Sequence, residues 1–363
     1  MKDVLRIILI AGAFISYIIG AGTATGQEIL QFFASFGYLG IGAILIAMIL
    51  HAWFGAYLLG TGQKLQAESS GDIFRYFCGK YLGTFFDWFS QMFILIVFVV
   101  MISGAGATLT EYYDVNIYVG RFVISLLVLI TVLLGLNRMV KILGAIGPLI
   151  ILLVVLIGGT SFFTNLAGFA QAGQILEEIN VPKATNSWWL SGFIYSSFVV
   201  LVATPFLIKL GKSEPKRKNV IWGGILGGIL ILVAVLAIYL GILSNIEVAY
   251  VKDIPTLFLA DQIHPMFGVL FSIVLLVSIY STAAPMLWTV TNYFAKDNVK
   301  KFRLVAIGVT VLGFFGGLLP FGQIIGTVYP YVGYMGMLLF AGMFYRQFIN
   351  KGSIHLSSTK QRN

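Results

Sequence analysis

Long runs of apolar residues, broken by only a few polar positions, follow one another along the whole chain. A helix needs about 20 apolar residues to cross a hydrocarbon core about 30 Å thick, and most of the runs reach that length. The sequence lacks the alternating segments of roughly ten residues that mark a membrane β-barrel. The pattern predicts an all-α integral membrane protein with ten transmembrane helices, at about 5–32, 38–60, 81–111, 118–136, 140–163, 187–209, 219–244, 266–293, 302–319 and 322–345.

The composition agrees with a lipid environment. Hydrophobic residues make up 59% of the chain and charged residues 10%, whereas a soluble domain carries about 25% charged residues. The net charge of +9 does not indicate nucleic-acid binding, because the basic residues lie in short loops between the apolar runs. We therefore expect the lipid bilayer, and no nucleic acid, as a partner.

The distribution of basic residues predicts the orientation. If the N-terminus lies inside the cell, only Arg121, Lys183 and Lys252 of the 23 Lys and Arg residues lie outside. This bias follows the positive-inside rule. The first apolar run, after Lys2 and Arg6, resembles a secretion signal but continues past Gly26, so we interpret it as an uncleaved helix. Both termini are expected in the cytoplasm.

Ten spans suggest two halves of five helices, which we place at 1–165 and 185–347, followed by a disordered cytoplasmic tail at 348–363. An odd number of helices per half means that the second half enters the membrane from the opposite side. Such inverted repeats hold a binding site near the bilayer midplane, where the equivalent helices of the two halves are interrupted. Helices 1 and 6 are therefore the places to look for a site.

Helix 1 carries three glycines in its middle, Gly20, Gly22 and Gly26, with Thr23 and Thr25 between them. Each glycine costs roughly 1 kcal/mol in a helix interior relative to alanine. The cluster predicts local unwinding, and the amides freed at the start of the outer half-helix would face an anion such as a substrate carboxylate. The alternative is close helix packing through small residues.

Two polar residues follow this cluster directly. Gln27 and Glu28 lie inside the same apolar span. An acid near the bilayer centre costs about 2.5–3.5 kcal/mol on insertion scales, so it usually faces a cavity or a partner. These residues favour a binding site over simple packing.

Helix 6 has Ser196 and Ser197 just before its middle and Pro205 after it. Proline removes one intrahelical hydrogen bond, and the serines can satisfy freed backbone groups. The pattern predicts a break opposite helix 1, although a mildly kinked helix is the alternative.

Helix 8 contains Ser278, Ser281 and Thr282 near its midpoint. Hydroxyl oxygens are hard ligands that suit a small cation when carbonyls from a broken helix complete the shell. The alternative is that these hydroxyls bond back to their own helix.

Outside the spans, the segment 253–265 opens with an acid and an early proline, which predicts a short helix over the extracellular mouth; an ordinary amphipathic loop is the alternative.

Enzyme signatures such as an HExxH zinc pair or a phosphate-cradling loop are absent from the sequence. We therefore do not expect an enzyme.

The residues of helix 1 also carry a family resemblance. The run IIGAGTATGQE resembles the G-[SA]-G signature of the amino acid–polyamine–organocation superfamily. GAG-x-A-[ST]-GQE followed by aromatic residues is similar to the YkvI-like amino-acid permeases of bacteria, and the likeness covers the whole chain in length and span count. The resemblance implies a LeuT-type fold, a five-plus-five inverted repeat with broken helices 1 and 6, in a bacterial cytoplasmic membrane.

The resemblance also implies roles for particular residues. Gly20, Ala21, Gly22 and Thr23 match the segment that binds a substrate carboxylate, and Ser196, Ser197 and Phe198 lie where the helix 6 break should fall. Ser281 and Thr282 resemble the hydroxyl pair of a sodium site, with the carbonyls of Ser16 and Ile19 opposite. Lys141, the lysine of helix 5, lies too near the cytoplasmic end to replace that sodium, which favours sodium over protons.

The leading hypothesis is a symporter for an amino acid or similar small zwitterion, coupled to Na⁺ or H⁺, with no other cofactor. The alternative is a nutrient-sensing subunit resembling those of spore-germination receptors. The solute, the coupling ion and the oligomeric state remain open. The expected substrate-binding residues are Gly20, Ala21, Gly22, Thr23, Thr25, Gly26, Gln27, Glu28, Ser196, Ser197 and Phe198, and the expected sodium ligands are Ser16, Ile19, Ser278, Ser281 and Thr282.

Overall fold

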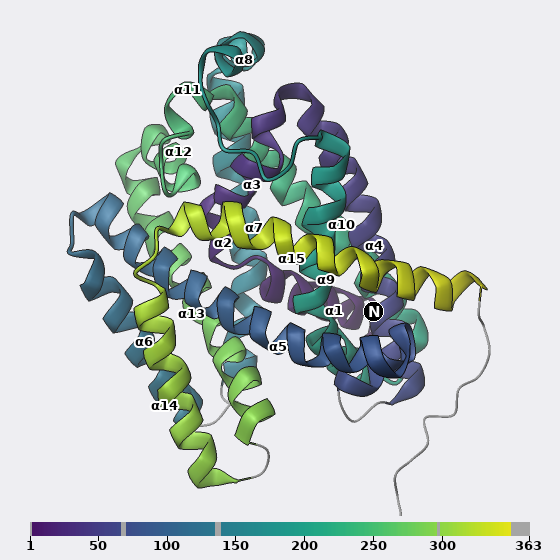
Figure 1. The fold of residues 1–363 in the computed structure, drawn as a ribbon. Coiled ribbons are helices and arrows are strands. Elements are labelled where there is room, and N and C mark those ends of the chain that lie inside the picture. The colour runs from purple at the N-terminus through teal and green to yellow at the C-terminus, as the bar shows by residue number, and fades with distance from the viewer. Residues whose placement is uncertain (1, 67–69, 135–138, 296–297, 350–363) are drawn as a thin grey trace, which may run out of the picture.

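The chain folds into a bundle of helices (Figure 1). The computed structural model describes residues 2–66, 70–134, 139–295 and 298–349, and this part of the chain contains no strand. Its first half comprises α1 (Lys2–Ile18), α2 (Ala21–Thr25), α3 (Gln27–Phe32), η1 (Ala34–Leu39), α4 (Gly40–Leu65), α5 (Ser70–Tyr113), α6 (Ile117–Leu134), α7 (Met139–Thr164) and α8 (Leu166–Glu178). Its second half comprises α9 (Trp188–Lys212), α10 (Arg217–Ser244), α11 (Ile246–Ala249), α12 (Pro255–Ile263), α13 (Pro265–Ala295), α14 (Val299–Gly316), α15 (Phe321–Phe344) and η3 (Tyr345–Ile349).

The all-helical membrane architecture is confirmed, but the count of ten spans is not. In the described residues, seven helices are long and apolar enough to cross a membrane, or eight if α7 and α8, bent by 85° at their junction, form one span. All ten predicted ranges do contain helix. α1 is not counted as a span because it ends after 17 residues. α14 is not counted because three of its 18 residues are the basic Lys300, Lys301 and Arg303.

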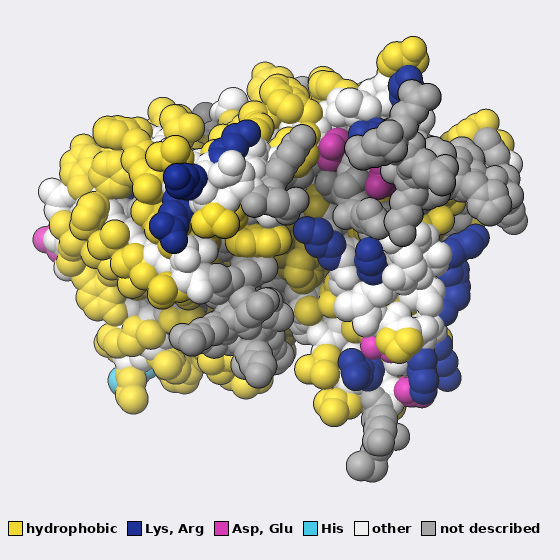
Figure 2. All heavy atoms as spheres, turned by 90° about the horizontal axis from the view of Figure 1, so that it is seen from below, with side chains coloured by type: hydrophobic (Ala, Val, Ile, Leu, Met, Phe, Trp, Pro, Cys, Tyr) yellow, Lys and Arg dark blue, Asp and Glu magenta, His cyan; other side chains and the backbone are white. Residues whose placement is uncertain are grey.

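The outward faces of peripheral helices expose large apolar side chains. On α6, Phe122 is 58% exposed, and on α14, Leu304 is 71% and Phe315 61% exposed. Exposed apolar surface of this kind suits contact with lipid rather than water. Figure 2 shows one half of the underside covered mainly by hydrophobic side chains, while most of the visible Lys and Arg side chains gather over the other half.

The centre of the bundle is formed by helices that are buried on most sides. In the most apolar windows of α9 and α5, 78% and 72% of residues are buried inside the bundle. α4 packs along both α9 and α10. Glycines permit this approach, because a Cβ added at Gly55 of α4 would stand 2.8 Å from the carbonyl oxygen of Gly224 in α10.

The predicted break in helix 6 is not present. α9 runs without interruption from Trp188 to Lys212, across the serine pair and Pro205. Ser196 and Ser197 donate to the carbonyls of Gly192 and Phe193 at 3.0 and 2.7 Å, one turn earlier in the same helix. The serine hydroxyls therefore add bonds to carbonyls that a continuous helix already presents, and they do not mark unwound backbone.

The predicted division into two repeats stays a prediction. α8 lies between the ranges 1–165 and 185–347. Of the predicted tail, residues 348 and 349 belong to η3, and 350–363 lie outside the described residues.

Candidate functional site

The first predicted span is interrupted twice. α1 ends at Ile18, and Gly20 is extended, with φ −100° and ψ −159°. The five residues of α2 follow, and Gly26 then has φ +88°, a left-handed conformation that favours glycine, before α3 begins. The expectation that the backbone stops being helical within Gly20–Gly26 is confirmed, with the stops at the two ends of the cluster.

Each glycine of the cluster lies against a different element. A Cβ added at Gly20 would stand 3.0 Å from Cγ2 of Thr282 on α13. At Gly26 it would stand 2.7 Å from Oγ1 of Thr256, near the start of α12. The segment 255–263 is therefore the predicted short helix, and its first turn packs on the second interruption.

The carboxylate of Glu28 returns to the start of the interruption. Although Glu28 belongs to α3, a Cβ added at Gly22 would overlap its Oε1 atom. Thr23 donates its hydroxyl to Oε2 of Glu28 at 2.7 Å, and the Glu28 residue is only 5% exposed. The place where we expected a substrate carboxylate is thus filled by a carboxylate of the protein itself.

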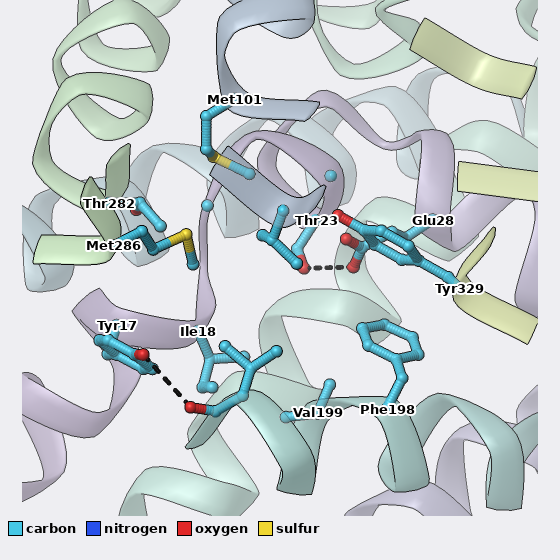
Figure 3. Close-up of a pocket in the computed structure, with 14 residues that line it drawn as sticks. Tyr17, Ile18, Thr23, Glu28, Met101, Phe198, Val199, Thr282, Met286 and Tyr329 are labelled. Atoms are coloured by element: carbon cyan, nitrogen blue, oxygen red, sulfur yellow. Dashed lines mark hydrogen bonds between the residues drawn. The ribbon is translucent and has the colours of Figure 1, made fainter. Parts of the chain in front are cut away.

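A cavity of about 40 Å³ lies beside this carboxylate, between α1, α2, α3, α5, α9, α13 and α15. In Figure 3, Thr23, Glu28, Tyr329 and Phe198 lie on one side, and Met101, Met286 and Thr282 lie on the other. A water molecule needs at least about 10–15 Å³ of such space, so the cavity has room for a few waters but not for a larger solute. The lining residues are Tyr17, Ile18, Gly20, Gly22, Thr23, Glu28, Val97, Met101, Phe198, Val199, Val202, Thr282, Met286 and Tyr329.

Four predicted substrate residues line this cavity from the first span, namely Gly20, Gly22, Thr23 and Glu28. Phe198 lines it from α9, where its ring lies 4.7 Å from that of Tyr329. The backbone of Ala21 begins α2, and its side chain lies outside the described part.

Other predicted substrate residues lie elsewhere. Ser196 and Ser197 are absent from the lining, as are Thr25 and Gly26. The Thr25 hydroxyl donates to the carbonyl of Gly22 at 3.0 Å.

Gln27 belongs to a different network, beside the segment before α12. Its Nε2 donates to the carbonyl of Lys252 at 2.7 Å, and its Oε1 accepts from Nε2 of Gln31 at 2.9 Å. The same Gln31 nitrogen reaches the carbonyl of Gly322 at 3.0 Å, at the start of α15. These bonds join α3, the 245–265 segment and α15, so Gln27 links three elements just after the second interruption.

Two of the predicted cation ligands, Ser278 and Ile19, meet where α1 ends against α13; the cation site itself stays a prediction. Ser278 donates its hydroxyl to the carbonyl of Ile19 at 3.1 Å, and Ser281 donates to the carbonyl of Ser278 at 2.8 Å. Oγ of Ser16 and Oγ1 of Thr282 are buried, and neither has a hydrogen-bond partner within the described chain. Oxygen atoms of this kind are suited to a small hard cation. The side chain of Lys141 lies outside the described part.

Sequence reasoning missed several walls of the cavity. Val97 and Met101 of α5 and Met286 of α13 line it, and none of the three was among the predicted site residues. α5 is apolar on nearly every side, so periodicity does not indicate which face meets the cavity. Tyr329 carried a signal, because it precedes Pro330 within an apolar span.

Comparison with known proteins defines the class of fold. The structure aligns with MhsT in complex with L-phenylalanine at a TM-score of 0.65, with 14% identity, over 97% of this chain and 92% of that one. It aligns with a Na⁺-coupled sialic acid symporter at 0.64, with 13% identity, over 94% and 79%. Mhp1, a nucleobase-cation-symport-1 family transporter with bromovinylhydantoin bound, gives 0.59, with 13% identity, over 96% and 80%. The chain is a multi-pass membrane protein with the LeuT-type fold.

Two proteins of Bacillus subtilis (strain 168) are similar in sequence. The uncharacterized membrane protein YkvI is 22% identical over 328 residues, which cover 90% of this chain and 92% of YkvI. The uncharacterized protein YyaD is 26% identical over 330 residues, which cover 89% and 91%. No protein-family model matches the chain. The resemblance to YkvI-like proteins predicted from helix 1 is confirmed as a similarity along most of the sequence.

Proposed function

We propose that this protein is a secondary active transporter that carries a small solute with an amino group, an amino acid or a similar zwitterion, across the bacterial cytoplasmic membrane. The observation that carries the proposal is the interruption of the first span at Gly20, which lines a buried cavity together with Glu28. Irregular backbone within a bilayer is tolerated where it lines a cavity, and interrupted helices form the sites of transporters built from inverted repeats.

The kinds of protein that share the fold support the proposal. MhsT was solved with L-phenylalanine, and a second similar structure is a Na⁺-coupled symporter in its substrate-bound outward-open state. Both are about as long as this chain or somewhat longer, since the alignments cover 92% and 79% of them. We infer the same general activity here, with both termini on the cytoplasmic side.

The coupling ion that fits best is Na⁺. The carbonyl of Ile19 lies just past the end of α1, where it accepts from the Ser278 hydroxyl, and the hydroxyls of Ser16 and Thr282 are buried without partners in the described chain. Backbone carbonyls and hydroxyl oxygens are typical ligands of hard cations. A sodium ion held between α1 and α13 would link cation binding to the position of the interruption. Coupling to H⁺ is the alternative.

In this scheme the structure is a conformation without room for a solute. A typical ligand pocket measures about 300–1,000 Å³, whereas the cavity measures about 40 Å³. Solute entry therefore requires the helices around the cavity to separate, first on one side of the membrane and then on the other. The Gln27 and Gln31 bonds to Lys252 and Gly322 are contacts that must break on their side.

Uptake into proteoliposomes tests the proposal. We expect accumulation of at least one labelled amino acid or amine when an inward Na⁺ gradient is imposed, and none when choline replaces sodium. Thr282→Val keeps the side-chain shape and removes one hydroxyl, so it should raise the Na⁺ concentration for half-maximal uptake about tenfold or more.

Thr291→Val is the matched control. Thr291 is a buried threonine on the same helix, its hydroxyl also lacks a partner in the described chain, and it does not line the cavity. This variant should leave the Na⁺ dependence unchanged. Absence of uptake of any amino acid or amine under either a Na⁺ or a H⁺ gradient would overturn the proposal.

A further inference from the structure

The position of Glu28 indicates which chemical group of a solute the cavity could bind. Its carboxylate fills the space beside Gly22 and lines the cavity. The residue is 5% exposed, and its neighbour Thr23 supplies a hydroxyl hydrogen bond at 2.7 Å. The solute cavity thus contains a fixed acidic group that belongs to the protein.

No basic residue of the described lining faces this acid across the cavity. Of the described residues that line it, none is Lys, Arg or His. The ion pairs Arg6–Glu214, Arg75–Asp72 and Lys216–Asp3 do not include Glu28. A buried carboxylate without a cation is costly, and a bound cation offsets that cost.

The same charge argues against a solute carboxylate at this position. Like charges within about 4–6 Å disfavour one another, so an anionic group placed beside Gly22 would be repelled by Glu28. An ammonium group in the same place would be attracted, and it would donate hydrogen bonds that a carboxylate accepts. The local charge therefore selects for a cationic group.

The remaining walls describe the rest of the solute. The rings of Phe198 and Tyr329 lie 4.7 Å apart at 46° beside the acid, and aromatic faces attract cations within about 6 Å. Opposite them, Met101 and Met286 give flexible apolar surface. The cavity suits a solute with one cationic end and an apolar body.

We infer that Glu28 is the specificity-determining residue of the site, and that it binds the ammonium group of a small apolar amine in preference to an amino acid that also carries a carboxylate. The inference rests on the proposed transport function and narrows its substrate class. It assigns Glu28 a direct contact with the solute.

Three probes with the same phenyl ring separate the possibilities, namely 2-phenylethylamine, L-phenylalanine and 3-phenylpropanoate. We expect purified protein in detergent, with sodium present, to bind the amine at least about tenfold more tightly than the amino acid. The carboxylate alone should not bind measurably. Isothermal calorimetry gives the three dissociation constants.

Variants of Glu28 test the residue itself. Glu28→Gln keeps the size and removes the charge, so it should weaken amine binding by about 30-fold or more, as expected for one lost partner of a buried charge pair. Glu28→Asp keeps the charge and should retain the preference for the amine. Glu214→Gln is the matched control, because Glu214 is also 5% exposed but lies outside the cavity; it should bind as the wild type does. If Glu28→Gln does not fold, the inference is still tested by the order in which the wild type binds the three probes, and by whether Glu28→Asp retains the preference for the amine.

Several results would overturn the inference while leaving transport intact. These are tighter binding of phenylalanine or phenylpropanoate than of the amine, or an unchanged amine affinity in folded Glu28→Gln. Unchanged amine affinity together with a lost pH dependence of uptake would identify Glu28 as a proton carrier instead. Failure of the wild type to bind or take up any amine or amino acid would overturn the proposed function, and this inference with it.

Discussion

At the scale of single residues, the geometry at Gly22 depends on a missing side chain. Glu28 reaches the start of α2 only because Gly22 has no Cβ, and any larger residue would overlap Oε1. Thr23 then fixes the carboxylate by its hydroxyl at 2.7 Å. The glycine thus has a function besides freeing the backbone, since it makes room for an acid.

This reading predicts the effect of Gly22→Ala. The added methyl group should push the Glu28 carboxylate away from its place. It should lower the free energy of unfolding by about 1–3 kcal/mol, the usual cost of overpacking a core. Amine binding should fall more than the stability change alone explains. Calorimetry on the folded variant measures the binding, and a thermal melt measures the stability.

Gly159→Ala on α7 is the comparison for that variant. A Cβ there would meet nothing within 4 Å, so the change should be neutral or slightly stabilising. Equal amine affinity in the two alanine variants would show that the space beside Gly22 is not needed for binding.

At the scale of elements, the sequence predicted a helix break correctly where the backbone preference of glycine causes it. It predicted a break wrongly where the only signal was a pair of polar side chains. Three glycines between Gly20 and Gly26 predicted an interrupted span, and the span is interrupted at both ends of that cluster. The serines of α9 gave a similar polar signal, but a hydroxyl can serve a continuous helix as well as a broken one. Polarity alone does not distinguish the two, whereas three closely spaced glycines do.

The start of α1 is tied to the segment before α10 by an ion pair. Nζ of Lys216 lies 2.7 and 3.0 Å from the two carboxylate oxygens of Asp3. The hydrogen bond from Lys216 holds the pKa of the Asp3 carboxyl below its usual value of 3.8. A carboxylate with a lowered pKa stabilises the fold at neutral pH, and this stabilisation is lost as the pH falls through the lowered pKa.

Asp3→Asn should therefore lower the melting temperature slightly at pH 7, because both groups of the pair are exposed to solvent. The difference from the wild type should shrink as the pH falls below the usual aspartate pKa of 3.8, and it should disappear once the pH is below the lowered pKa of Asp3. Melting curves across pH measure it, with Glu177→Gln on the surface of α8 as the control that should follow the wild type throughout. A difference that stays constant down to acid pH would contradict the role of the ion pair.

At the scale of the whole molecule, the fold class followed from the apolar runs, whereas the count of ten spans is not confirmed. Apolar runs in the sequence show where helices are apolar, but not where each helix begins. The first turns of α14 include Lys300, Lys301 and Arg303, so this helix is less apolar than the run that predicted it. The cavity walls on α5 were equally hidden, because a helix buried on most sides shows no preferred face. Which faces meet depends on packing between helices distant in sequence.

The charge bias along the chain predicts which side of the membrane each loop occupies. In a Cys78→Ala background, Lys183→Cys should react with a membrane-impermeant maleimide in intact cells, because it belongs to the side with few basic residues. Lys301→Cys should react only after the membrane is permeabilised. Both lysines are exposed at the surface, so access of the reagent depends on the membrane alone. The reverse pattern would place both termini outside the cell.

The size of the central cavity has a consequence for the membrane that holds this protein. A space of about 40 Å³ contains a few water molecules at most, which is too little for a continuous water column beside Glu28. In this conformation the described residues around Glu28 therefore leave too little room for a hydrated ion to pass through this cavity. If the protein is the ion-coupled transporter proposed above, this conformation would not dissipate the ion gradient through this cavity.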